Sequence, residues 1–75
     1  MKITYDAEVD ALYIRLIEEP RECVPLRLTE EITINRGPNQ EIVGIEILDA
    51  SEVLGFSRDN PEIRLASLRP ILDAA

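Results

Sequence analysis

Short segments in which apolar and polar residues alternate dominate this 75-residue chain. Residues 11–17 read ALYIRLI, and residues 2–5, 31–36 and 41–48 show a similar period of two. This period is typical of β-strands, because successive side chains of a strand point to opposite faces of the sheet. The sequence therefore predicts an α+β fold built on a small, mainly antiparallel sheet of about four or five strands.

The segment Gly37-Pro38-Asn39-Gln40 predicts the turn between the two strands at 31–36 and 41–48, because these residue types favour tight turns. A four-residue loop at this position pairs Ile34 with Val43 and Ile32 with Ile45. A slip of one residue would divide the aliphatic side chains between the two faces of the sheet. The predicted register instead gathers five of them on one face: Ile32, Ile34, Val43, Ile45 and Ile47.

The segment from Cys23 to Leu28 also alternates, but it contains Pro25. Proline has no backbone N–H to donate, so a strand that contains it belongs at the edge of a sheet. The segment is therefore ambiguous, and Pro25 favours a place at the edge of a sheet over a central strand.

The pattern changes after the last predicted strand. Asp49 followed by Glu52 resembles a capping box, which predicts a helical turn over about residues 50–54 that ends at Gly55. Asn60 and Pro61 then have the residue types of an N-cap and a first helical position, so a second helical segment is expected over about 61–69.

These boundaries indicate a sheet domain at residues 1–54 and a C-terminal extension at residues 55–75. We expect the extension to be helical and to pack on the sheet or on a partner.

The chain carries two distinctive motifs, YDAEVDALYI at residues 5–14 and IVGIEIL at residues 42–48. Both resemble those of a known family of short bacterial proteins, the domain-of-unknown-function family 2283. The similarity covers roughly residues 1–54, although the tip at 37–40 lacks the acidic turn ending in Gly that members commonly carry.

The resemblance implies a compact antiparallel sheet with helical material at its C-terminal end. It implies no catalytic residue, because the family has no established activity. Some members look like the small partner in two-gene arrangements with a compact toxin-like protein, which implies an antitoxin-like role.

The formal charge of −7 arises from 15 acidic and 8 basic residues. Nucleic-acid binders normally need a basic stripe, and the basic residues here are scattered, so we expect no nucleic-acid partner. A basic protein suits this charge better. No apolar run approaches the roughly 20 residues that span a bilayer, the N-terminus lacks the apolar core of a signal peptide, and one Cys fits a reducing compartment. We therefore expect a cytoplasmic protein without membrane contact.

Asp6, Glu8 and Asp10 form the best candidate for a polar site, because three carboxylates in five residues offer oxygen ligands to Ca²⁺ or Mg²⁺. The favoured interpretation is a turn in which the Asp side chains hold the backbone and Glu8 faces water. A cation-binding protein or a small metal-dependent enzyme that uses these residues is the alternative.

Tyr5 and Tyr13 flank this turn, and we expect them to pack across a hairpin. No Ser has a His to activate it, because the chain contains none, so no catalytic residue and no cofactor are predicted.

Three further residues have structural interpretations. Glu46 is expected to be an exposed or salt-bridged strand residue, and Gly44 to mark a bulge or a close approach of another backbone. Cys23 is expected to be a small packed hydrophobe.

A chain of this length buries only a small core, so self-association is a plausible source of further stability. The alternation also suggests apolar side chains on both faces of the sheet, which leaves one face in need of a cover. We therefore expect a non-enzymatic protein–protein interaction module that forms a homodimer. The candidate interface residues are Ile17, Ile42, Leu48, Leu65 and Leu68.

Overall fold

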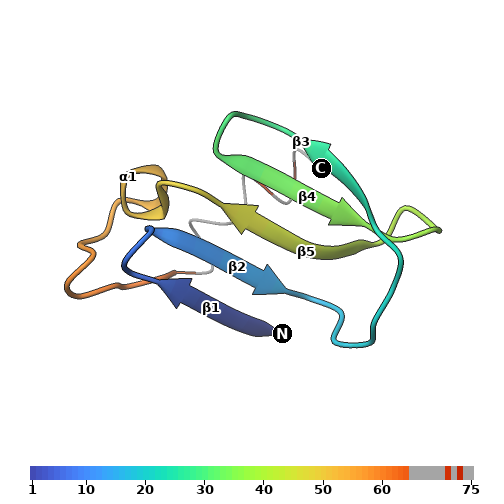
Figure 1. Cartoon of the computed structure of the whole chain (residues 1–75), viewed down its shortest axis with the longest axis horizontal. Coiled ribbons are helices and arrows are strands. Elements are labelled where there is room, and N and C mark those ends of the chain that lie inside the picture. The colour runs from blue at the N-terminus through green and yellow to red at the C-terminus, as the bar shows by residue number, and fades with distance from the viewer. Residues whose placement is uncertain (65–70, 72, 74–75) are drawn as a thin grey trace.

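A computed structural model describes residues 1–64, 71 and 73 of the chain. Five strands form one antiparallel sheet in the order β1-β2-β5-β4-β3 (Figure 1). The helical turn α1 (Ala50–Leu54) stands at one end of this sheet. The strands are β1 (Lys2–Asp6), β2 (Ala11–Arg15), β3 (Val24–Arg27), β4 (Ile32–Arg36) and β5 (Ile42–Ile47). The predicted antiparallel sheet with minor helix is thus confirmed.

The hydrophobic core lies on one face of the sheet. Leu12 and Ile14 of β2 lie opposite Ile47 and Ile45 of β5, and Ile34 of β4 also lies opposite Ile45. All five side chains are almost completely buried. The residues that cover this face come largely from the segment after the sheet: Ala50, Leu54, Phe56, Ile63 and Ile71. The chain therefore provides its own cover for its core.

The opposite face of the sheet is polar, so the prediction of apolar side chains on both faces is wrong. Tyr13, Arg15, Thr33 and Asn35 alternate with the buried residues of β2 and β4 and are half-buried. Glu46 of β5 is exposed on this face, as predicted. Ile17 and Leu48 follow the last residues of β2 and β5, so they lie in connections and form no second apolar face of the sheet.

The register of β4 and β5 differs by two residues from the predicted one. Ile34 lies opposite Ile45 and not opposite Val43. The pairing shifts near Arg36, which lies opposite Ile42, so Val43 is an extra residue in β5 and forms a β-bulge. A shift of two residues keeps every side chain on the same face, and therefore the predicted apolar face was still correct for Ile32, Ile34, Ile45 and Ile47.

The hairpin tip also differs from the predicted four-residue loop. Gly37 N–H donates to the Glu41 carbonyl at 2.8 Å, so these two residues close a loop of three residues. Gln40 N–H donates to the Gly37 carbonyl at 3.1 Å, and Gln40 has a φ of 67°. A turn followed by a left-handed residue is a common three-residue hairpin connection, and hairpins of this type carry a β-bulge beside the loop.

The helical turn α1 ends at Gly55 as predicted, with a φ of 74°. The predicted cap at Asp49 is wrong: its side chain makes no capping hydrogen bond, and its φ of 50° is left-handed. After α1 the chain runs past the end of β1 (Figure 1). Residues 61–64 are irregular, so no helix begins at Pro61, and the rest of the helix predicted to 69 lies outside the described residues.

Gly44 of β5 leaves room for the ring of Tyr13 on the polar face. A Cβ at this position would lie 2.6 Å from Tyr13 Cζ and 3.1 Å from the carbonyl oxygen of Ile14. Tyr13 Oη also accepts a hydrogen bond from Asn35 Nδ2 at 3.4 Å. The predicted close approach at Gly44 is therefore made mainly by a side chain.

We predict that Gly44→Ala lowers the free energy of unfolding by about 1–3 kcal/mol, because the new methyl displaces the Tyr13 ring. The cost should be smaller in a Tyr13→Ala background, where only the Ile14 carbonyl remains close. Urea unfolding of the two single variants and the double variant measures this difference. Equal costs in both backgrounds would contradict this account of Gly44.

Candidate functional site

The free edge of β1 is defined by the direction of its backbone groups. Leu16 N–H donates to the Val43 carbonyl at 2.9 Å, so the even-numbered residues of β2 direct their backbone groups towards β5. The odd-numbered residues of β2 therefore face β1, where Tyr13 lies opposite Thr4. The backbone N–H and C=O groups of Lys2, Thr4 and Asp6 face β2. The backbone groups of Ile3 and Tyr5 point in the opposite direction, away from β2.

Apolar side chains are exposed beside this edge. Ile3 is 37% exposed on β1, Met1 precedes it at 61%, and Val9 of the following turn is 66% exposed. Within the described part of the chain, β1 pairs only with β2. An edge strand with unpaired backbone groups and exposed apolar side chains is a template for another strand.

The other edge of the sheet is less suited to pairing. β3 is an edge strand, as Pro25 predicted. Leu28 N–H donates to the Ile32 carbonyl, so Val24 and Leu26 face β4, and Pro25 and Arg27 point outward. The outward position at Pro25 has no N–H, which removes one donor from the middle of this edge.

A buried carboxylate, Asp10, fixes the turn between β1 and β2. Asp10 is 7% exposed, and its φ of 53° is left-handed. Its Oδ1 accepts hydrogen bonds from Tyr5 Oη at 2.6 Å and from Ser51 N at 3.0 Å, and Ser51 Oγ donates to Oδ2 at 2.7 Å. The Asp10 carbonyl accepts from Ala50 N at 3.0 Å. Asp10 therefore satisfies the first backbone N–H groups of α1, the role predicted for Asp49.

Tyr5 and Asp10 shift each other's pKa in opposite directions. Burial raises the pKa of Asp10, but the hydrogen bonds from Ser51 and Tyr5, with the nearby Arg58 charge, outweigh burial and lower it below 3.8 overall. Burial and the hydrogen bond to Asp10 raise the pKa of Tyr5 above 10.0. The pair therefore consists of an ionised carboxylate and a neutral phenol around neutral pH.

Two contacts join the segment after α1 to this turn. The Phe56 ring packs edge-on against the Tyr5 ring, with centroids 5.2 Å apart. The Arg58 guanidinium donates to the carbonyls of Ala7 and Glu8. No local pattern in the sequence joins Asp10 to Ser51, which lies 41 residues away, or Arg58 to Ala7, so sequence reasoning missed Ser51 and Arg58.

The structure separates the three carboxylates of the cation-binding alternative. Asp6 Oδ1 accepts from Glu8 N at 3.0 Å, which is the predicted turn-holding role, and Glu8 is exposed. Asp10 instead points towards Ser51. Among the described residues no group of three His, Cys, Asp or Glu side chains is placed to hold a metal ion.

Tyr5 and Tyr13 lie on opposite faces of the sheet, so their predicted packing against each other is wrong. Tyr5 lies opposite Leu12 and packs against the core, whereas Tyr13 lies opposite Thr4 on the polar face. Neighbouring strand positions alternate between faces, and the register places the two rings on positions of opposite parity.

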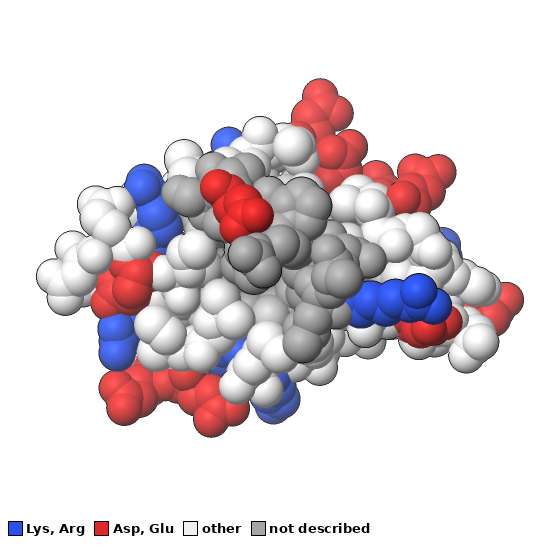
Figure 2. Space-filling view, turned by 180° about the vertical axis from the view of Figure 1, so that it is seen from behind, with Lys and Arg blue, Asp and Glu red and all other residues white. Residues whose placement is uncertain are grey.

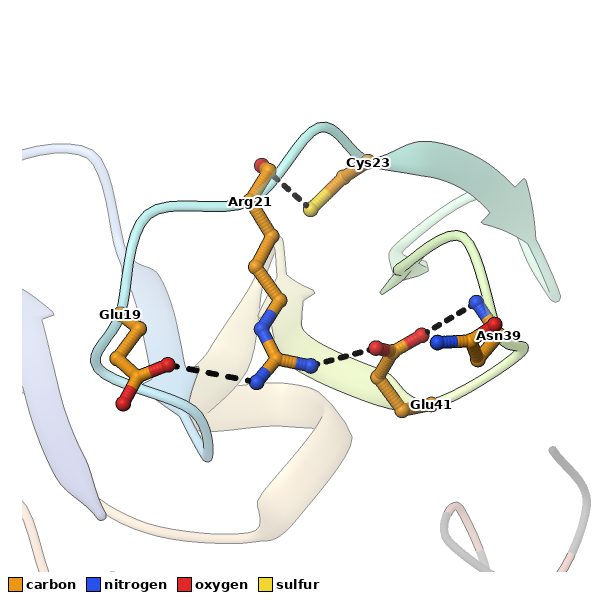
Figure 3. Close-up of polar contacts among 5 residues, drawn as sticks. All are labelled: Glu19, Arg21, Cys23, Asn39 and Glu41. Atoms are coloured by element: carbon orange, nitrogen blue, oxygen red, sulfur yellow. Dashed lines mark hydrogen bonds and ion pairs between the residues drawn. The ribbon is translucent and has the colours of Figure 1, made fainter.

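Arg21 ties the connection between β2 and β3 to the β4–β5 hairpin (Figure 3). Its guanidinium donates to Glu41 Oε2 at 2.5 Å and lies 3.6 Å from Glu19 Oε2. Asn39 N donates to Glu41 Oε1 at 2.8 Å. Backbone hydrogen bonds from Glu41 itself and Asn39, followed by the Arg21 contact, lower the pKa of Glu41 despite its partial desolvation.

Cys23 lies beside Arg21, and its Sγ is 3.4 Å from the Arg21 carbonyl (Figure 3). The thiol is exposed, so the prediction of a packed hydrophobe is wrong. Cys23 lies immediately before β3, which is the strand at the outer margin of the sheet.

The predicted interface residues occupy different environments. Ile42 is half-buried and packs against the core, and Ile17 is half-buried. Leu48 is 42% exposed immediately before α1. Leu65 and Leu68 lie outside the described residues. In the part of the chain that is described, no helix has the length and apolar character that a membrane span requires.

These features define a small protein with a mainly antiparallel sheet and a self-covered core, in which the β1 edge has no partner strand among the described residues. The chain belongs to the family described as "Protein of unknown function (DUF2283)", whose model matches residues 2–51. This match confirms the resemblance seen in the two sequence motifs. Comparisons with curated proteins and with solved structures gave no match.

The pKa of Asp10 leads to a prediction about stability and pH. Because the folded pKa lies below 3.8, ionised Asp10 stabilises the protein above that pH, and this contribution is lost as the pH falls through the folded pKa. Asp10→Asn should lower the Tm by roughly 5–10 °C at pH 7, as expected for lost hydrogen bonds to a charged group. Thermal melts of both proteins at pH 7 and at decreasing pH measure the difference, which should shrink in acid.

Glu8→Gln is the matched control, because Glu8 lies in the same turn with an exposed side chain. We expect this variant to melt within a degree or two of the parent, since exposed positions contribute little. A Tm difference for Asp10→Asn that stays constant down to the acid transition would refute the role of the ionised carboxylate. The raised pKa of Tyr5 predicts a loss of stability in alkali as well: the contribution of neutral Tyr5 is lost as the pH rises from 10.0 through the folded pKa.

Proposed function

We propose that this protein is a non-enzymatic protein–protein interaction module that associates with itself and binds through the edge of β1. One observation carries this proposal: the backbone groups of Ile3 and Tyr5 point outward from the β1 edge and have no partner strand among the described residues. Strand addition at such an edge draws affinity from main-chain hydrogen bonds and specificity from alternate side chains.

The contrast between the two edges supports β1 as the binding edge. Unlike β3, β1 contains no proline, and it presents both N–H and C=O groups at Ile3 and Tyr5. The contacts of Asp10 and Arg58 also hold the turn after β1 in one conformation, which lowers the entropy cost of ordering this edge on binding.

The chemistry of the Asp10–Ser51 pair supports a non-enzymatic role. Ser51 Oγ donates to Asp10 Oδ2 at 2.7 Å, but the lowered pKa of Asp10 makes this carboxylate a weak base. A nucleophilic serine needs a base with a pKa close to the working pH. The pair therefore fits the attachment of α1 better than catalysis.

A basic protein is the second proposed partner, in an antitoxin-like role. The net charge is −7, and acidic side chains stand in several groups around the margin of the face seen in Figure 2. Leu48 and Val53, next to and within α1, add exposed apolar surface near Asp49 and Glu52. The proposed setting is the cytoplasm, where an exposed thiol such as Cys23 stays reduced.

The basic-partner proposal is tested by mixing the purified protein with the product of the neighbouring gene at increasing salt. We expect a complex at low salt whose affinity falls as the salt concentration rises, because exposed charges are screened. If the two proteins elute separately at every salt concentration, the antitoxin-like role is refuted.

We predict that Ile3→Pro weakens self-association at least roughly tenfold. The substitution removes an outward N–H in each copy, and two lost hydrogen bonds of about 1 kcal/mol each account for this factor. The bonds from β1 to β2 remain, because Lys2, Thr4 and Asp6 make them. Sedimentation equilibrium over a wide range of protein concentrations measures the change.

Ile3→Val is the matched control, because it keeps the N–H and a β-branched side chain. It should self-associate almost as the parent protein does. Circular dichroism of both variants verifies that the sheet is intact. Unchanged association of a folded Ile3→Pro variant would show that the β1 edge is not the binding site.

A further inference from the structure

The sequence of β1 is complementary to itself when two copies run antiparallel. The strand reads Lys2-Ile3-Thr4-Tyr5-Asp6, with a positive charge at one end and a negative charge at the other. If a two-fold axis passes beside Thr4, Lys2 of each copy lies opposite Asp6 of the other. Opposite charges and Thr–Thr pairs at directly opposed positions both stabilise antiparallel strands.

The backbone groups fit the same register. Antiparallel neighbours exchange N–H···O=C bonds at every second pair of residues. With the axis at Thr4, Ile3 of one copy lies opposite Tyr5 of the other, and these are the two residues whose groups point outward. Each Ile3–Tyr5 pair can therefore exchange both of its hydrogen bonds, and Thr4 lies opposite Thr4 at a non-hydrogen-bonded position.

Other registers pair fewer residues of β1 or oppose backbone groups that are already bonded. A shift of one residue would place Ile3 opposite Thr4, whose backbone groups are already bonded to β2. An axis at Ile3 leaves Asp6 beyond the paired region, and an axis at Tyr5 places Lys2 opposite Glu8, which belongs to the turn and not to the strand. A parallel arrangement would bring like charges together. The Thr4 register alone uses all five residues of β1.

The faces of the sheet are also continuous in this register. Ile3 and Tyr5 lie on the core face, and Lys2, Thr4 and Asp6 lie on the polar face. The exposed side of Ile3 would then lie beside Tyr5 of the second copy, next to Phe56. Pairing therefore extends the apolar layer and the polar layer without placing a charge in the core.

We propose that the occupant of the β1 edge is β1 of a second copy, paired antiparallel about Thr4 with Lys2 opposite Asp6. This inference rests on the proposed function, because it names the partner and the register of the same edge. The dimer it describes has one continuous sheet, in which the two β1 strands are the central neighbours.

Disulfide trapping tests the register directly. In a Cys23→Ser background, Thr4→Cys places two thiols opposite each other at a non-hydrogen-bonded pair, where the Cα atoms lie about 4.5 Å apart and a disulfide can form. We expect Thr4→Cys to cross-link at least roughly tenfold faster than Lys2→Cys under mild oxidation, because a cysteine at position 2 faces Asp6 instead. Lys2→Cys is the matched control, since it exposes a thiol on the same face of the same strand.

Charge reversal provides an independent readout. Lys2→Glu alone sets like charges opposite each other, so we expect association to weaken roughly tenfold at low salt. Adding Asp6→Lys to Lys2→Glu restores opposite charges and should recover most of the affinity. The difference between these variants should shrink at high salt.

The outcomes separate this inference from the proposed function. If Thr4→Cys cross-links no faster than Lys2→Cys while Ile3→Pro still weakens association, the register is wrong and the β1 edge remains the binding site. If the parent protein is monomeric at every concentration and neither cysteine variant cross-links, self-association itself is refuted. Fast cross-linking through Thr4 together with recovery by the double charge reversal supports the dimer.

Discussion

The rest of the structure depends on the hydrogen bonds that the Asp10 carboxylate accepts. A single helical turn such as α1 is not stable by itself, because helix nucleation costs more than one turn returns. Asp10 fixes it by accepting hydrogen bonds from Ser51, and it fixes Tyr5 with the same carboxylate. Phe56 then packs on Tyr5, and Ala50 and Leu54 contact the core. One ionised side chain thus attaches the cover of the core to the sheet.

The strands were predictable from the sequence because their signals are local. The period of two located β1, β2, β4 and β5, Pro25 favoured a sheet edge for the segment that forms β3, and Gly55 marked the end of α1. The register of β4 and β5 was not predictable in the same way. A two-residue shift leaves every side chain on the same face, so the alternation does not distinguish the two registers. The observed register goes with the bulge at Val43 and the left-handed Gln40, which have no signal in the alternation.

Contacts between distant segments account for the other errors. Asp49 has the local sequence of a cap, yet a residue 41 positions from Ser51 performs that role. The predicted second apolar face assumed that the strands extend as far as the aliphatic residues do. The strands end earlier, at Arg15 and Ile47, so Ile17 and Leu48 belong to connections. The binding edge could not be predicted from the sequence for a related reason. The outward direction of the Ile3 and Tyr5 backbone groups follows only from the hydrogen bonds between β2 and β5.

The tertiary amide nitrogen of Pro25, which carries no hydrogen, has a consequence for the size of any assembly. A sheet that accepts neighbours at both margins can polymerise into a fibre, because every added subunit offers a new template. In the described part of this chain the β3 margin lacks the central N–H at Pro25, so a dimer paired through β1 as proposed would leave only that weaker margin unpaired. Assembly by the proposed β1 pairing would therefore end at two chains.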